Sequence, residues 1–186
     1  MRPHSRSAGK LSAQDMALLA LMGALMFVMQ LALSSLRNIH ITAVLIILTA
    51  IFFGWRVMYA VCVFVLLEGL TWGFGLWVVS YMYLWPILAV VAVLLRRNDS
   101  ALLWAIVAGL HGLFFGLGCS IPYLFIGGWS MAFSYFVSGL PFDIRHCVGN
   151  FVLTLVLYRP LRRAMAAALR QIKPDVPGGG KRIEQR

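Results

Sequence analysis

The sequence has few charged residues, and acidic ones are the scarcest. Only 12% of its 186 residues are charged while 61% are hydrophobic, and 6 Asp and Glu stand against 16 Lys and Arg. Average soluble chains are roughly half apolar and about a quarter charged, so a soluble domain of this length could not bury so much apolar surface. The composition therefore excludes a soluble globular protein and indicates an integral membrane protein.

The sequence also lacks the motifs that mark an enzyme or an ATPase. It contains no HExxH, no G-x-S-x-G, no paired intramembrane Asp and no P-loop. Its three cysteines, Cys62, Cys119 and Cys147, lie in apolar segments without CxxC spacing and are interpreted as packing residues. His111 has no close His or Cys partner in sequence, so neither a metal site nor a cofactor is expected. Energy for uphill transport would have to come from a partner or an ion gradient.

The positive charges are distributed unevenly along the chain. If the apolar spans alternate in direction, all 16 Lys and Arg except Arg37 and Arg145 fall on one side, including Arg56, Arg96 and Arg97. Lys and Arg are enriched in cytoplasmic loops, so both termini are predicted to be cytoplasmic. Membrane topology thus accounts for the net charge of +10, and nucleic acid is not an expected partner.

The apolar runs predict an all-α domain of six transmembrane helices over residues 13–165. A cytoplasmic tail at 1–12 precedes it, and a basic, disordered tail at 166–186 follows it. The expected spans are 15–36, 38–53, 57–76, 80–95, 101–120 and 142–158, with Ser12 and Ser100 as helix caps. Residues 121–140 contain Pro122, Gly127 and Gly128, and we expect an outer loop with a short helix there, suited to a lid.

Several polar side chains interrupt the predicted spans, where ionisable groups are costly and become functional candidates. Counting about 1.5 Å per residue from the outer ends places Glu68, His111 and Asn150 about 12–14 Å deep on three different helices. Asp143, His146 and Asn150 share one stripe of the last helix, at i, i+3 and i+7. This convergence predicts a pocket that opens outward. The alternative is hydrogen bonding between helices that only fixes the fold.

Aromatic residues are concentrated beside this polar layer. Six of them fall within a short segment: Trp72, Phe74, Trp77, Tyr81, Tyr83 and Trp85. Trp77 and Tyr81 are interpreted as anchors at the membrane interface. Pro86 is expected to kink its helix and turn Trp85 inward. The density of rings around Trp72 and Trp85 suits stacking on a flat ligand.

The first predicted helix carries small residues along one side. They are Ala13, Ala17, Ala20, Gly23 and Ala24. Such spacing lets another transmembrane helix approach closely. That helix is either a neighbour in the same chain or part of a separate membrane subunit, and both readings stay open at this point.

Several segments together resemble the substrate-binding S component of an energy-coupling factor (ECF) vitamin transporter. They are the AxxxA pattern Ala20–Ala24, RNIH at 37–40, FVLLEGLTWGFGLW at 64–77 and GLPFDIRHCVGNF at 139–151. The likeness covers about residues 13–163. Riboflavin-type members typically have Asn where Asp143 stands and Lys where His146 stands, and this departure weakens an assignment of riboflavin.

The resemblance implies a six-helix membrane protein of the plasma membrane of a bacterium or archaeon. It would bind a small water-soluble, vitamin-like compound of heteroaromatic type from outside. Its first helix would dock through Ala17, Ala20 and Ala24 on a transmembrane coupling subunit, which two cytoplasmic ATPases drive. The implied substrate-binding residues are Asn38, His40, Glu68, Trp72, Trp85, His111, Asp143, His146 and Asn150.

Two other classes remain open. A membrane scaffold, such as a cell-shape protein of the MreD type, has the same size and number of spans and would bind no ligand. An intramembrane enzyme would need a nucleophile beside a base. Ser134 or Ser138 near His146 could supply one, but nothing in their spacing favours it, so we do not expect an enzyme.

Overall fold

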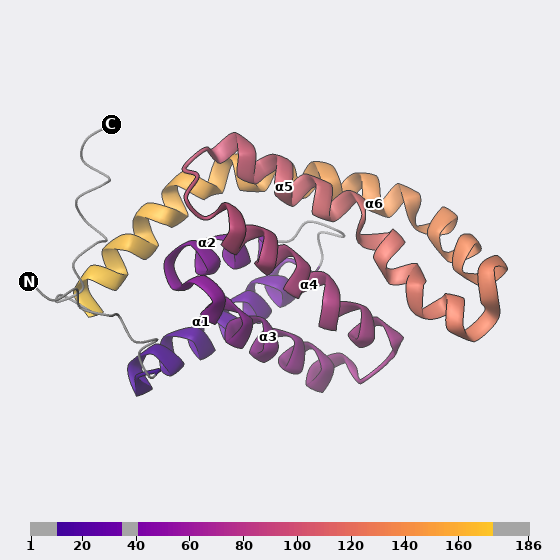
Figure 1. Ribbon diagram of the computed structural model, residues 1–186, viewed down its shortest axis with the longest axis horizontal. Coiled ribbons are helices and arrows are strands. Elements are labelled where there is room, and N and C mark those ends of the chain that lie inside the picture. The colour runs from indigo at the N-terminus through magenta and orange to yellow at the C-terminus, as the bar shows by residue number, and fades with distance from the viewer. Residues whose placement is uncertain (1–10, 35–40, 173–186) are drawn as a thin grey trace, which may run out of the picture.

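The structure, a computed structural model, describes residues 11–34 and 41–172, and their regular structure is helical (Figure 1). The elements in order are α1 (Ala13–Ala32), α2 (Thr42–Phe53), the 3-10 turn η1 (Gly54–Arg56), α3 (Val57–Trp72), α4 (Leu76–Leu95), α5 (Ala101–Leu113) and α6 (Phe115–Ile172). Within the described residues, four helical stretches have the length and apolar character needed to cross a bilayer, at 13–32, 42–72, 76–95 and 101–172. The predicted all-α class is confirmed.

Local sequence signals set several helix ends. Ser12 begins α1, because its side chain accepts a hydrogen bond from the Asp15 N–H at 3.0 Å. Ser100 begins α5 in the same way, through the Leu103 N–H at 3.3 Å. Both caps agree with the sequence prediction. Gly54 ends α2 in a backbone conformation with φ of +61°, which favours glycine.

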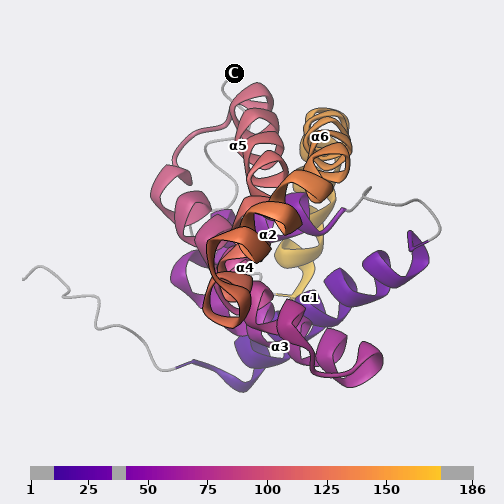
Figure 2. The ribbon, with the colours of Figure 1, turned by 90° about the vertical axis from the view of Figure 1, so that its right-hand side faces the viewer.

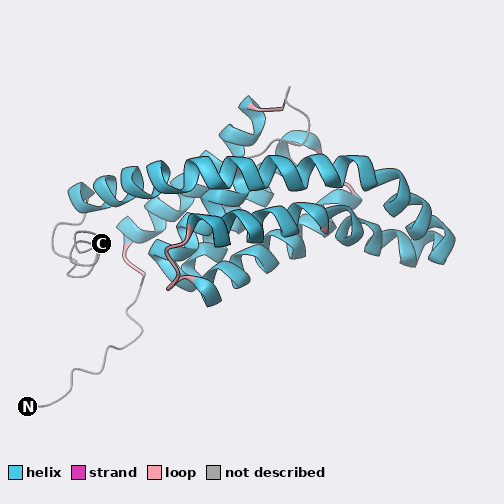
Figure 3. Cartoon of the chain, turned by 90° about the horizontal axis from the view of Figure 1, so that it is seen from above, coloured by secondary structure: helices cyan, strands magenta, loops and turns pink. Residues whose placement is uncertain are grey.

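The helices form two groups that lie side by side. α5 and α6 run together along one side of the molecule, and α1 and α3 lie on the opposite side (Figures 1 and 2). Figure 3 shows the last part of α6, which ends at Ile172, running almost the full length of the molecule. The α5–α6 contact is close because glycine lines it: a Cβ atom on Gly112 would lie 2.8 Å from the His146 carbonyl oxygen.

We expect Gly112→Ala to destabilise the protein by about 1–3 kcal/mol, because the added methyl group meets the backbone of α6 and the two helices must separate. Thermal unfolding in a mild detergent measures the change. Gly139→Ala is the matched control, since a Cβ there meets no atom within 4 Å and alanine favours the helix. Equal stability of the two variants would contradict the close α5–α6 packing.

The small residues of α1 face two directions. Gly23 is buried against α3, where an added Cβ would lie 2.5 Å from the Ala60 carbonyl oxygen. Ala17 and Ala20 are exposed and Ala24 is half-buried. The expectation that Gly23 shares a face with the alanines is therefore wrong, because close packing of α1 on α3 uses the glycine. Within residues 11–34 and 41–172, nothing covers Ala17 and Ala20.

Residues 121–140 are helical, so the expected outer loop is wrong. Non-helical backbone is confined to Gly127 and Gly128, and these two residues divide α6 into arms at 115–126 and 129–172. The arms stack through Tyr123 and Tyr135, whose ring centres are 4.2 Å apart. Backbone polar groups in an apolar environment must find partners within the chain, which favours helix over loop here despite Pro122. This hairpin extends beyond the other helices, at the right of Figure 1.

Two ion pairs join charged groups that lie far apart in the sequence. Arg56 and Asp15 form an ion pair at 3.2 Å, and Arg162 and Asp99 form one at 2.7 Å. α6 continues to Ile172, so the first residues of the predicted disordered tail are helical, and the remainder lies outside the described residues. The Ile172 carbonyl accepts a hydrogen bond from the Gln14 side chain at 3.0 Å.

Candidate functional site

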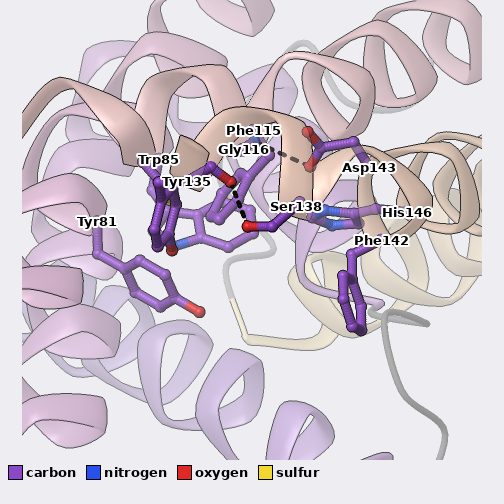
Figure 4. Close-up of a pocket in the computed structure, with 11 residues that line it drawn as sticks. Tyr81, Trp85, Phe115, Gly116, Tyr135, Ser138, Phe142, Asp143 and His146 are labelled. Atoms are coloured by element: carbon purple, nitrogen blue, oxygen red, sulfur yellow. Dashed lines mark hydrogen bonds between the residues drawn. The ribbon is translucent and has the colours of Figure 1, made fainter. Parts of the chain in front are cut away.

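A cavity of about 320 Å³ lies between α4 and α6 (Figure 4). Its lining residues are Tyr81, Trp85, Phe115, Gly116, Cys119, Tyr135, Ser138, Gly139, Phe142, Asp143 and His146. Both arms of α6 contribute, since Phe115 to Cys119 belong to the first arm and the residues from Tyr135 onward to the second. Small-molecule sites in proteins begin at about this volume, so the cavity has room for a compact solute.

One side of the cavity is built from aromatic rings that support one another. Trp85 on α4 is 1% exposed, and its ring centre lies 5.6 Å from Tyr81 and 5.4 Å from Phe115. Tyr81 and Phe115 are 5.8 Å apart. Rings in edge-to-face contact at these distances attract one another. The three side chains therefore form a stiff apolar wall against which a flat molecule can stack.

The other side carries Asp143. Its carboxyl group is held in place because Oδ1 accepts a hydrogen bond from the Gly116 N–H at 3.0 Å, and the residue is only 4% exposed. A Cβ atom on Gly116 would overlap this carboxyl group, so glycine at that position makes the contact possible. Among the residues that the structure describes, Oδ2 of Asp143 has no hydrogen-bond partner although it is buried.

His146 lies one turn after Asp143 on the same face of α6, and its ring centre is 5.1 Å from Phe115. Ser138 lies on the same arm and donates a hydrogen bond to the Tyr135 carbonyl at 2.9 Å, as Figure 4 shows. The cavity therefore combines a carboxyl group, an imidazole, a phenol and a hydroxyl group with three packed rings. Such a lining can hold a planar molecule and orient it through a few hydrogen bonds.

Three of the predicted site residues, Trp85, Asp143 and His146, meet at this cavity. His111 lies behind the aromatic wall, with its ring 5.3 Å from Trp85 and its Nε2 3.0 Å from the Leu84 carbonyl oxygen. Asn150 is turned toward α5, where its side chain donates a hydrogen bond to the Ala108 carbonyl at 3.3 Å. Neither His111 nor Asn150 lines the cavity.

Glu68 belongs to a separate polar cluster between α1, α2 and α3. It is 3% exposed, and the Gln30 side chain interacts with both Glu68 and Tyr81. The Thr42 hydroxyl donates a hydrogen bond to the side-chain oxygen Oε1 of Gln30 at 3.1 Å. Tyr81 therefore joins this cluster to the cavity wall, and Glu68 itself does not line the cavity.

The remaining predicted substrate-binding residues are Trp72, Asn38 and His40. Trp72 is at the end of α3 and 59% exposed, as expected of a membrane-facing anchor rather than a wall residue. Asn38 and His40 lie outside the described residues. The described residues include no group of three or more His, Cys, Asp or Glu side chains arranged to hold a metal ion.

Comparisons with known proteins leave the chain without an assigned relative. No family model, no curated protein and no solved structure matches it.

Most of the cavity-lining residues that α6 contributes are not predicted from the sequence. Tyr81 is predicted at the membrane interface, yet it lines the cavity, because Phe115 at the start of α6 packs against its ring. Tyr135 and Ser138 fell in the segment expected to be a loop. Gly116 gave a usable signal, since small residues recur at 116, 118, 119 and 120 in an otherwise bulky helix. Such a run indicates that something packs closely against the helix there.

Proposed function

We propose that this protein is the substrate-binding membrane subunit of an ECF-type importer, which captures a small, water-soluble heteroaromatic compound of the vitamin type. The observation that carries the proposal is the cavity, where Asp143 and His146 face a wall made of Tyr81, Trp85 and Phe115. Aromatic faces with a few placed polar groups are the usual lining of small-molecule sites.

The proposed topology has six spans with both termini in the cytoplasm. α1, α2, α3 and α4 form the first four, α5 continues into the first arm of α6 as the fifth, and the second arm is the sixth. Arg56 lies between the second and third proposed spans and Arg162 lies late in the sixth, and enrichment of basic residues marks the cytoplasmic side. The cavity then lies toward the outer side, from which a solute enters.

The exposed side of α1 is the proposed docking face for the coupling subunit. Of the four stretches able to span the bilayer, α1 has the smallest buried share. Ala17 and Ala20 are exposed there and have small side chains, and Ala24 is half-buried. Small side chains let two transmembrane backbones approach closely, where van der Waals contact drives association. The coupling subunit and its two ATPases would supply the energy for release inside.

A scaffold protein of the MreD type gives no reason for the polar side of the cavity. A buried acceptor without a partner, such as Asp143 Oδ2, destabilises a fold by about 1–3 kcal/mol. A bound solute that donates a hydrogen bond removes this penalty, whereas a scaffold without ligand keeps it. The arrangement therefore favours solute capture.

We expect gently extracted wild-type protein to retain one small molecule per chain, identified by mass spectrometry of the denatured sample. Gly139→Trp should reduce the retained amount at least about tenfold, because position 139 lines the cavity and an added side chain there meets open space. Val137→Trp is the matched control, since Val137 lies on the same arm, is 44% exposed and does not line the cavity. Wild-type protein that retains no solute, and whose producing cells take up none, would contradict the proposal.

A further inference from the structure

We infer that the buried end of the solute is a planar nitrogen group that is positively charged and bears N–H donors, such as an amidinium or a protonated amino-heterocycle. The inference deepens the proposed function, on which it rests, by assigning the charge of the substrate. It depends on one residue, Asp143, and on the side chains that surround it in the cavity.

The carboxyl group of Asp143 is positioned to accept a hydrogen bond from the solute. Oδ1 is occupied by the Gly116 N–H at 3.0 Å, so the group is fixed while Oδ2 stays buried and unpartnered among the described residues. Removing a buried acceptor from water without a partner is unfavourable, and removing a charged one more so. A cationic N–H donor restores the hydrogen bond and neutralises the charge together.

The aromatic wall strengthens the preference for a cation. The rings of Trp85, Tyr81 and Phe115 line the same cavity and contact one another. The face of an aromatic ring carries a partial negative charge and attracts cations within about 6 Å of its centre, tryptophan most strongly. A planar cation can therefore stack on this wall while its N–H groups point at Asp143.

The basic groups near the cavity do not favour an anion at its buried end. None of the lining residues in the described part of the chain is Lys or Arg. Arg145 is exposed, and its guanidinium carbon lies 5.2 Å from the centre of the Phe142 ring, which it covers instead of entering the cavity. His146 is the remaining lining residue that can carry a positive charge. An anionic group placed beside Asp143 would meet a like charge with no fixed cation to offset it.

Three flat probes of nearly equal shape separate charge from fit: benzamidine, a cation with N–H donors; benzamide, its neutral counterpart; and benzoate, an anion. We expect titration calorimetry on the protein in lipid nanodiscs to give benzamidine an affinity about ten- to a hundredfold above that of benzamide, since a hydrogen bond to a charged group adds this much. Benzoate should bind more weakly than benzamide. Binding of benzamidine should vanish in Gly139→Trp, whose new side chain fills the cavity.

Asp143→Asn keeps the shape of the side chain and removes its charge. It should lower benzamidine affinity about tenfold or more and leave benzamide affinity within about twofold. Asp99→Asn is the matched control, because it removes one carboxylate that is paired with Arg162, about five turns along α6 from Asp143. If Asp143→Asn does not fold, two measurements still test the inference. They are the order of affinity of the three probes for the wild-type protein and the loss of benzamidine binding in Gly139→Trp.

Benzoate binding as tightly as benzamidine, benzamidine affinity unchanged in Asp143→Asn, or no binding of any probe would each overturn the inference about charge. Its failure is distinguishable from failure of the proposed function. Suppose that the wild-type protein retains a solute, that Gly139→Trp releases it, and that the buried group of this solute is anionic. The inference about charge is then rejected, and the proposal of solute capture stands. Protein that holds neither a solute nor any probe rejects both.

Discussion

Ala20→Trp should abolish uptake of the solute while leaving its binding to the isolated protein unchanged. Ala20 is exposed on the uncovered side of α1, and the cavity is built by α4 and α6. An indole on this face would hold the backbone of a partner helix several ångströms farther away, and association through small residues depends on close approach. Accumulation of labelled solute by cells, measured beside the affinity of purified protein, tests both halves.

Leu21→Trp is the control for adding an indole to α1. Leu21 is 64% exposed and differs from Ala20 by one helical step of about 100°, so the new side chain points to another part of the surface. Uptake by this variant should stay within about twofold of wild type, as lipid-facing apolar changes usually have small effects. Loss of solute binding in Ala20→Trp, or normal uptake with it, would place the docking face elsewhere.

Trp85→Ala should lower the stability of the folded protein by about 3–5 kcal/mol and abolish solute binding. Trp85 is among the largest fully buried side chains, and its ring contacts Phe64, Tyr81, His111 and Phe115. Its removal leaves a void in the cavity wall and frees the rings that it holds. In a bilayer the loss is one of packing contacts, because lipid is as apolar as the protein interior.

Thermal unfolding in detergent measures the loss of stability, and Trp129→Ala is the control. Trp129 follows Gly128 at the start of the second arm of α6 and is 80% exposed, so its removal should change stability by less than about 0.5 kcal/mol. Trp85→Phe should fall between the two, since a ring remains in the wall. Equal stability of Trp85→Ala and Trp129→Ala would contradict the packing described for the cavity wall.

The features that sequence predicts well here are those set by local chemistry. Apolar runs gave the helices, and serine before a run gave two of the caps. The stripe that joins Asp143, His146 and Asn150 was read from helical periodicity, and all three are buried in the structure. The helical spacing of apolar and polar residues is a property of a short stretch of sequence, so it can be recognised without knowing which helices are neighbours.

The composition of the cavity depends on how neighbouring helices are aligned, which sequence does not reveal. Counting residues from the outer end of each predicted span places Asn150, His111 and Glu68 at the same depth in the membrane. The packing of α6 on α5 instead brings Asn150 to the Ala108 carbonyl, while His111 lies against Trp85 on α4. The roles predicted for Glu68 and His111 in substrate binding stay predictions, to be tested by their own substitutions.

The second arm of α6 has one more consequence. Asp143, His146, Asn150, Thr154 and Tyr158 all lie buried along it, and Arg162 follows one turn later in its ion pair with Asp99. A helix that turns about its axis turns along its whole length, apart from local bending at Pro141 and Pro160. Rotation that moves Asp143 would thus also strain the Arg162–Asp99 contact, so this helix mechanically links the cavity to the ion pair near its C-terminal end.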